Sequence, residues 1–189
     1  MESGPAGGAI LARDIAREND LAKVLSFDMG GTTAKTGLIQ DGTPGVTKDY
    51  EVGSAASSSE HGAKAGGYPI RTPVIDLVEI GAGGGSIAWI DGGGVLRVGP
   101  QSAGADPGPI FYGRGGWAPT ISDANVLLGR LNPEKLNAVK TTISLDDIKA
   151  TFEYKLGAPL RLDAIESAAA VIRVANTIMA GAIRMVSLS

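Results

Sequence analysis

The chain has 189 residues, of which 43% are hydrophobic and 28 are glycine, and it carries a formal net charge of −3 with no cysteine and one histidine. The hydrophobic content suffices for the core of one domain, while the glycine share is about twice the usual 7%. These values exclude disulfides, thiolate metal sites and multi-histidine metal sites, and the absence of a basic patch argues against binding to duplex nucleic acid.

The first third is expected to form one helix followed by strands. Apolar spacing predicts a helix over 5–18, with Ile10, Leu11 and Ile15 on one side. Asp41 and Gly42 are typical of a tight hairpin turn. The small, polar residues 53–67 are expected to form a mobile loop. The expected strands are Lys23–Asp28, which reads as a buried strand, Ala34–Gln40 and Val46–Val52.

The middle third reads as a second hairpin system. Val74–Ile80 is expected to be a strand that runs into the glycine cluster 81–86. Two further strands, 87–90 and 95–98, are expected on either side of a turn at 91–94. The long segment 99–116 is expected to be irregular, and such segments are often functional.

The last third is predicted to be helical. A short helix over 122–130 is expected with Ser122 as its N-cap, and Ser144 is expected to cap a second helix with a variant capping box. The clearest helix covers 164–186. Its predicted apolar face consists of Ile165, Ala168, Ile172, Ala175, Met179 and Val186. The order of elements predicts an α/β or α+β fold, with β-hairpins first and helices last.

The strongest local signal for chemistry lies at the end of the first strand. There Asp28 is followed by the turn residues Gly30 and Gly31 and by Thr32 and Thr33. Glycines let the backbone approach a phosphate closely, turn amides bind anions, and hydroxyls donate to phosphate oxygens. A carboxylate at a strand end suits Mg²⁺ or an attacking water. The alternative is an ordinary hairpin whose aspartate caps its own turn.

This pattern is not a P-loop, because Ala34 stands where the last glycine of that motif must be. Lys35 is therefore interpreted as a strand residue and not as a phosphate-binding lysine. The cluster Gly83, Gly84 and Gly85 partly imitates a dinucleotide fingerprint, but a strand follows it instead of a helix. A phosphate-facing or substrate-facing glycine loop and a closely packed β-turn both remain open.

Three weaker candidates lie elsewhere in the sequence. The segment from Glu2 to Gly8 leads into a helix N-terminus, which favours anions, and Glu2 is a candidate for positioning a water; a plain helix start is the alternative. His61 is expected to be solvated. In and just after segment 99–116, Tyr112, Arg114 and Trp117 are possible ligand contacts, and Asp123 follows close behind; a purely structural role is the favoured alternative for this segment.

Read together, these segments resemble the hydantoinase A/5-oxoprolinase family, which includes ATP-dependent N-methylhydantoinase and acetone carboxylase subunits. The resemblance covers nearly the whole chain. The matching segments are ESGPAGG (2–8), SFDMGGTTAK (26–35), IDLVEIGAGGGSIAWID (75–91), LRVGPQSAGADPGPIFYGRGG (96–116), ISDANVLLGRLNP (121–133) and IRVANTIMAGAIRMVS (172–187).

The resemblance implies a ribonuclease-H-like fold of the actin, sugar-kinase and heat-shock ATPase superfamily, present here as an incomplete subdomain. The residues around Asp28 would be the second phosphate loop. By this resemblance Asp28 serves Mg²⁺ or the attacking water, Glu2 positions water, and the cofactor-binding residues are Gly30, Gly31, Thr32, Thr33, Gly83, Gly84 and Gly85.

The division that we expect is a partial ATPase domain over 1–189, with a phosphate-loop hairpin region over 1–53, a glycine-rich region over 54–120 and a helical segment over 121–189. The first phosphate loop and the adenosine loop of the superfamily are not found in this sequence. Because both ends also look abrupt, we expect a fragment that is nearly inactive alone.

The implied activity is ATP-dependent opening of a hydantoin or 5-oxoproline type of cyclic amide, with Mg²⁺ and a hydantoinase B-like partner subunit or domain. The alternatives are an ATP-dependent ketone carboxylase subunit and a non-catalytic glycine-rich binding module. No run of about 18 apolar residues and no signal peptide is evident, so we expect a cytoplasmic protein without a membrane-spanning helix.

Overall fold

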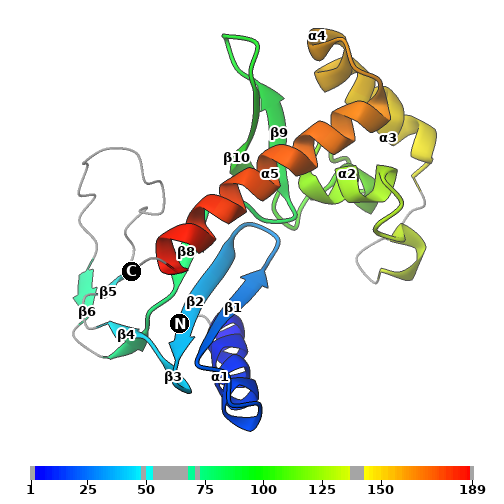
Figure 1. Ribbon diagram of the computed structural model, residues 1–189. Coiled ribbons are helices and arrows are strands. Elements are labelled where there is room, and N and C mark those ends of the chain that lie inside the picture. Colours follow the sequence, from blue (N-terminus) through cyan, green and yellow to red (C-terminus); the bar gives the residue numbers. More distant parts are fainter. Residues whose placement is uncertain (1–2, 48–49, 53–67, 71–72, 137–142, 188–189) are drawn as a thin grey trace. The chain divides into compact units, whose positions relative to one another are not determined.

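The computed structural model describes residues 3–47, 50–52, 68–70, 73–136 and 143–187, drawn as coloured ribbon in Figure 1. Contacts between residues divide the chain into two units, which are described separately. Unit 1 comprises Met1–Met29, Ala34–Ile80 and Ala180–Ser189, and unit 2 comprises Gly30–Thr33 and Gly81–Met179. The result is a mixed α/β fold, as expected from the order of elements.

Unit 1 is built on an antiparallel hairpin of β1 (Lys23–Met29) and β2 (Ala34–Gln40), visible beside α1 in Figure 1. The register runs from the pair Lys23 and Gln40 to the pair Met29 and Ala34. At the far end of β2, Asp41 and Gly42 both have positive φ, of 48° and 67°. Two such residues form the tight two-residue turn predicted from the sequence.

The third strand of unit 1 differs from the prediction. The short strand β3 (Thr43–Pro44) pairs with β2 in place of a strand over 46–52. After Pro44 one more hydrogen bond joins this segment to β2, from Gly45 N–H to Leu38 O at 3.1 Å. The remaining strands of unit 1 are β4 (Val46–Thr47) paired with β7 (Val74–Ile75), β5 (Tyr50–Val52) paired with β6 (Tyr68–Ile70), and β8 (Val78–Ile80) paired with β2.

Helix α1 (Ser3–Glu18) packs against β1, β2 and β3 through small residues. Ala9 and Ala16 are buried, whereas the larger Ile10, Leu11 and Ile15 are exposed. The side of the helix predicted to carry these three residues is therefore not its packing side. Small side chains let a helix approach a sheet closely, so the large apolar side chains lie elsewhere on the helix surface.

Strand β1 was expected to be buried, and this is also wrong. Leu25, Phe27 and Met29 alternate along one face of β1 and are exposed. Among the described residues β1 pairs with β2 alone, so β1 is an edge strand of this sheet. By contrast, β2 has neighbours on both sides, and Ala34–Gly37 is buried.

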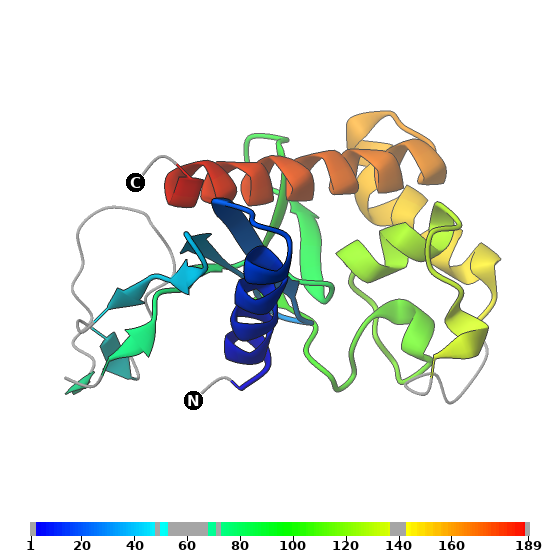
Figure 2. The ribbon, with the colours of Figure 1, turned by 60° about the horizontal axis from the view of Figure 1, so that its bottom comes forward.

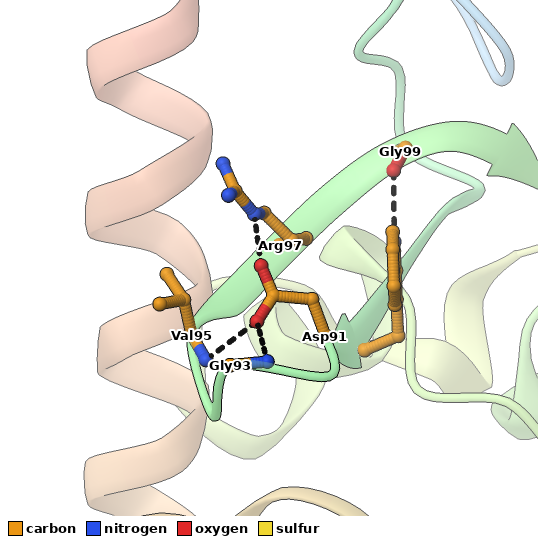
Figure 3. Close-up of polar contacts among 6 residues, drawn as sticks. Asp91, Gly93, Val95, Arg97 and Gly99 are labelled. Atoms are coloured by element: carbon orange, nitrogen blue, oxygen red, sulfur yellow. Dashed lines mark hydrogen bonds and ion pairs between the residues drawn. The ribbon is translucent and has the colours of Figure 1, made fainter.

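Unit 2 begins with the predicted second hairpin, formed by β9 (Ser86–Ile90) and β10 (Leu96–Ser102). Strand β10 extends into segment 99–116, which is therefore less irregular than expected. The turn between the strands is held by the Asp91 carboxylate, which accepts hydrogen bonds from the amides of Gly93 (3.0 Å) and Val95 (2.9 Å) and pairs with Arg97 Nε at 2.8 Å (Figure 3). The hydrogen bond from Val95 and the Arg97 guanidinium lower the pKa of Asp91.

The helical part of unit 2 surrounds its hydrophobic core. The elements are η1 (Ile110–Tyr112), α2 (Ile121–Leu127), η2 (Pro133–Lys135), α3 (Leu145–Phe152), the π-helical turn η3 (Glu153–Gly157), α4 (Ala158–Leu160) and α5 (Ala164–Ser187). Buried residues of β9, β10, α2, α3 and α5 form one apolar cluster. Ser144 caps α3 as predicted, but its hydroxyl accepts from Asp146 N–H and not from N3.

Helix α5 is one uninterrupted helix (Figure 2). Most of its predicted apolar face is buried or half-buried, but Ile165 is 42% exposed. By length and composition α5 could cross a membrane, so the exclusion of such a helix was too strong. Ala168, Val171 and Ala175 are buried in the apolar cluster, and a core helix passes the same test of length and composition.

The first turn of α2 is capped by Thr120 and not by Ser122 as predicted. Thr120 Oγ1 accepts from Asp123 N–H, and the Asp123 carboxylate accepts from Thr120 N–H at 3.0 Å, a reciprocal capping box. The carboxylate also accepts from Phe111 N–H at 3.0 Å. Burial raises the pKa of Asp123, while the hydrogen bonds from Thr120 and Phe111 oppose that effect. Asp123 is therefore structural and does not contact a ligand from the surface.

We expect Asp123→Ala to lower the free energy of unfolding by about 3 kcal/mol, because two buried N–H groups lose their acceptor. Thermal denaturation of the full-length protein measures the effect. Glu134→Ala, at an exposed position of η2, serves as the control and should leave the melting temperature unchanged. Equal melting temperatures for the two variants would contradict the capping role.

Candidate functional site

Asp28 lies one residue before the end of β1 in unit 1, and it is exposed. Its carboxylate has no hydrogen bond or ion pair with another residue that the structure describes. A Cβ atom at Gly4 would lie 3.8 Å from Asp28 Oδ2, so the first turn of α1 lies beside this carboxylate. The amides and positive dipole end of that turn favour negative charge. The Asp28 carboxylate is thus free to bind a ligand, and the adjacent helix N-terminus favours negative charge at this place.

The turn after Asp28, residues Gly30–Thr33, belongs to unit 2. Gly30 N–H donates to Thr33 O at 2.9 Å and closes the turn. For the N–H groups of Gly31 and Thr32, no hydrogen bond to any described residue is found. Gly30, Gly31 and Thr32 are exposed, and Thr33 is half-buried. The turn therefore offers two free amides and the Thr32 hydroxyl as donors.

A second glycine segment braces this turn from within unit 2. Gly84 N–H donates to Gly30 O at 2.9 Å, and Gly85 N–H donates to Gly31 O at 2.5 Å. Gly83 N–H donates to Ser86 Oγ at 2.8 Å. The three amides are already used as donors to the protein. The geometry therefore assigns Gly83, Gly84 and Gly85 a supporting role, and direct cofactor binding by their amides stays a prediction without structural support.

The two segments approach so closely that position 83 requires glycine. A Cβ atom at Gly83 would lie 2.6 Å from Thr32 C, 2.7 Å from Thr33 N and 2.8 Å from Gly30 O. All three atoms belong to the backbone, which cannot give way as a flexible side chain can. The absent side chain at Gly83 thus sets the position of the turn.

The glycine segment is itself anchored, through contacts that sequence reasoning missed. Ser122 N–H at the start of α2 donates to Gly84 O at 2.8 Å, and Ala103 N–H donates to Gly85 O at 2.8 Å. Ser86, the residue directly after the glycine cluster, is fully buried, and its hydroxyl accepts from Gly83 N–H. These contacts join residues far apart in the chain, and no local pattern in the sequence indicates them.

Lys35 is a buried strand residue, as interpreted from the sequence. Its side chain is 10% exposed, and its Nζ lies 3.7 Å from Glu79 Oε1 on the neighbouring strand β8. A buried ammonium needs a compensating charge, and Glu79 supplies one.

Comparison with known proteins identifies the family. The sequence model described as hydantoinase/oxoprolinase matches residues 1–189. The chain belongs to the hydantoinase/oxoprolinase family. Across 99% of its length it is 48% identical to an uncharacterised protein of Methanocaldococcus jannaschii, covering 27% of that protein. It is 34% identical to the caprolactamase subunit alpha of Pseudomonas jessenii, covering 100% of this chain and 25% of the subunit.

Two solved structures resemble this family member. The crystal structure of the ATP-dependent caprolactamase from Pseudomonas jessenii matches with a TM-score of 0.80 at 34% identity, over 98% of this chain and 25% of that one. A nucleotide-free acetone carboxylase matches with a TM-score of 0.74 at 26% identity, over 93% and 23%. The chain thus spans about a quarter of the length of these relatives.

The remaining predicted residues have varied outcomes. Glu2 and His61 lie outside the described residues. Tyr112 packs edge-on against Phe111, with ring centroids 4.8 Å apart, and Arg114 lies over the Tyr112 ring and donates to Ala105 O at 3.1 Å. Tyr112 and Arg114 therefore have structural partners in the loop.

The described side chains could bind Mg²⁺ only through few protein ligands. Within the described ranges no group of three or more His, Cys, Asp or Glu side chains is placed to hold a metal ion. Asp28 would be a single carboxylate ligand. Mg²⁺ is commonly bound by one or two carboxylates together with substrate phosphates and water, so this arrangement fits a metal that arrives with a nucleotide.

Proposed function

We propose that the chain forms a phosphate-binding part of an ATP-dependent enzyme that opens a cyclic amide of the hydantoin or 5-oxoproline type. The observation that carries the proposal is the exposed carboxylate of Asp28, followed directly along the chain by a turn with free amides at Gly31 and Thr32. Family membership and the ATP dependence of the similar caprolactamase support it.

The proposed reaction activates an amide by phosphoryl transfer. The amide oxygen takes the γ-phosphoryl group of ATP as the bond between that phosphorus and the β-phosphate oxygen breaks. Water then adds to the activated carbon, and the ring C–N bond breaks to give an acyl phosphate and an amine that takes up a proton. A second water hydrolyses the acyl phosphate to a carboxylate and free phosphate. Phosphoryl transfer relies mainly on positioning and charge stabilisation, which a rigid turn with free amides can supply.

Each residue has a definite part in this proposal. The amides of Gly31 and Thr32 and the Thr32 hydroxyl donate to phosphate oxygens. Asp28 binds Mg²⁺ or orients the attacking water, and bound Mg²⁺ would neutralise charge on the phosphates. Gly30 and Thr33 close the turn. Glu2 is a further candidate for positioning water.

We also propose that unit 1 is part of a ribonuclease-H-like sheet, as the family resemblance implies, and that a hydantoinase B-like subunit or domain completes the reaction. The hairpin of β1 and β2 with a glycine turn supports the former. The caprolactamase relative is a subunit alpha, which supports the latter proposal. The cytoplasmic location expected from the sequence remains part of the proposal.

The second candidate is a subunit of an ATP-dependent ketone carboxylase, favoured by the structural likeness to acetone carboxylase. The same phosphate site would serve both reactions. Assays of the full-length protein and its partner against hydantoins, 5-oxoproline and ketones distinguish the two candidates. If only ketones are turned over, in the presence of bicarbonate, the carboxylase replaces the amidohydrolase as the proposed function.

We expect Gly31→Ala to weaken ATP binding by the full-length protein at least tenfold while its melting temperature stays unchanged. A Cβ atom at Gly31 meets no atom within 4 Å and φ is not positive, so the fold tolerates alanine. The added methyl group instead stands where a phosphate must approach the backbone. Calorimetric titration with ATP measures the affinity.

Gly92→Ala is the matched control, because position 92 is equally open but lies in the turn of β9 and β10. Unchanged ATP affinity in both variants would show that no phosphate approaches Gly31. A non-catalytic binding module, the third alternative, also predicts this outcome.

A further inference from the structure

Three charged side chains form one row across the sheet of unit 1, and the proposed function uses only one of them. In the register of β1 and β2, Asp28 lies directly opposite Lys35. In the register of β2 and β8, Lys35 lies directly opposite Glu79. Residues directly opposite each other in antiparallel strands point to the same face, with their Cβ atoms about 5 Å apart. This charged row of Asp28, Lys35 and Glu79 therefore places an ammonium group between two carboxylates.

The packing around Lys35 keeps its side chain in the charged row. Lys35 is buried, and its Nζ lies 3.7 Å from Glu79 Oε1. The next row on the same face is closed, because Ser26 Oγ donates to Gly37 O at 3.3 Å and a Cβ atom at Gly37 would lie 2.8 Å from Leu77 Cδ2. That packed row leaves the lysine side chain no room in this direction, so the ammonium stays beside the two carboxylates.

The charge next to Asp28 comes from Lys35. The first turn of α1, which lies beside the Asp28 carboxylate, carries no charged side chain over residues 3–6. Val24 and Ser26, the described residues of β1 that share a face with Asp28, are uncharged as well. Among the described residues that these registers and contacts place next to Asp28, Lys35 is therefore the one with a charge.

An ammonium group in this position acts on the Asp28 carboxylate without occupying it. Asp28 forms no ion pair with a described residue, so its oxygens stay available to a ligand. Opposite charges attract each other across a few ångströms, and more strongly where burial lowers the local dielectric constant. The attraction draws the Asp28 side chain towards β2 and opposes its rotation into water. A fixed direction of this kind is what phosphoryl transfer requires of a charged group.

We propose that Lys35 is a positioning residue of the phosphate site, and that its ammonium group, between Asp28 and Glu79, sets the direction of the Asp28 carboxylate. This inference rests on the proposed function, because Asp28 is the group on which Lys35 acts. Glu79 attracts the ammonium from the other side and keeps it from closing an ion pair with Asp28. Lys35 itself binds no phosphate, in agreement with its interpretation as a strand residue.

The test is a double-mutant cycle in the full-length protein, with steady-state release of phosphate from ATP as the measurement. Lys35→Gln removes the charge and leaves an amide that can donate to Glu79. We expect kcat to fall about tenfold, a usual size for the coupling of two neighbouring groups. The KM for ATP should stay unchanged, because Lys35 acts on Asp28 and not on the nucleotide. Added to Asp28→Asn, the same change should cause no further loss, because the charge on which Lys35 acts is already gone.

Lys23→Gln is the matched control, because Lys23 is an exposed lysine at the other end of the hairpin, opposite Gln40. It should leave kcat, KM and the melting temperature unchanged. Lys35→Met provides a second variant without the charge, in case the glutamine variant does not fold. A purely structural role of Lys35 predicts a different pattern, namely a lower melting temperature and equal fractional losses of kcat with Asp28 and with Asn at position 28.

Each outcome bears on the proposal. A kcat of Lys35→Gln within about twofold of the unchanged protein overturns the positioning role, while a slow Asp28→Asn variant shows that the phosphate site stands. A loss that persists in the Asp28→Asn background also overturns it, because Lys35 then acts independently of Asp28. Full activity of Asp28→Asn, or no ATP hydrolysis by the unchanged protein, overturns the phosphate site and this inference together.

Discussion

The variant Asp28→Asn is expected to lower ATP hydrolysis by the full-length protein roughly a hundredfold, the effect of losing one key electrostatic group in an active site. Asparagine keeps the size of the side chain but removes the charge that binds Mg²⁺ or orients water. The carboxylate is exposed and makes no hydrogen bond or ion pair with another described residue, so its replacement should not disturb the fold. Steady-state release of phosphate, with the melting temperature measured in parallel, checks both statements.

The matched control for this change is Asp41→Asn, the same chemical substitution in the turn at the other end of β2. Asp41 has a φ of 48°, a conformation that asparagine also adopts readily. The control should retain full activity. If Asp28→Asn hydrolyses ATP as fast as the control, the assignment of the phosphate site is wrong, and the binding-module alternative takes its place.

Gly83→Ala is expected to lower the free energy of unfolding by about 2–3 kcal/mol, the usual cost of forcing an extra methyl group into a filled space. The new Cβ atom would collide with backbone atoms of Thr32, Thr33 and Gly30. The turn must then move away from the glycine segment. Since small displacements of a catalytic group cost about a hundredfold in rate, we expect kcat for ATP hydrolysis to fall by a similar factor.

Gly92→Ala again provides the comparison, because a methyl group there meets open space. The combination of reduced stability and reduced kcat separates Gly83 from Gly31, whose substitution should affect ATP affinity alone. If Gly83→Ala keeps wild-type kcat and stability, the glycine segment does not position the turn. Thermal denaturation and steady-state kinetics of the three variants make this comparison directly.

The local features of the fold could be predicted because the chain encodes them over short distances. Asp41 and Gly42 adopt the positive φ values that a two-residue hairpin turn requires, and Ser144 caps α3 with its own hydroxyl. The strand Ala34–Gln40 agrees with its predicted bounds. The exposure of Asp28 also agrees with the role predicted for a carboxylate at a strand end.

Predictions failed where a distant segment decides the outcome. Val46–Thr47 and Tyr50–Val52 form two short strands whose partners, β7 and β6, follow a long intervening segment. The sequence left open whether Gly83, Gly84 and Gly85 face a phosphate or form a closely packed turn. In the structure the amides of Gly84 and Gly85 brace a turn some fifty residues earlier, and the Gly83 amide donates to Ser86. Asp123 was a candidate ligand contact until its burial and its hydrogen bonds to Thr120 and Phe111 were known.

For this protein the sequence by itself determined the family, the hairpin with its glycine turn, and the helix and turn residues that act on their near neighbours. Only the tertiary structure decided which amides of the two glycine segments are free, which face of β1 is exposed, and which charged residues form one row across the sheet. The physical reason is that hydrogen-bond partners and burial are often supplied by segments that are distant in the sequence and close in the fold. A local sequence pattern does not identify such a partner.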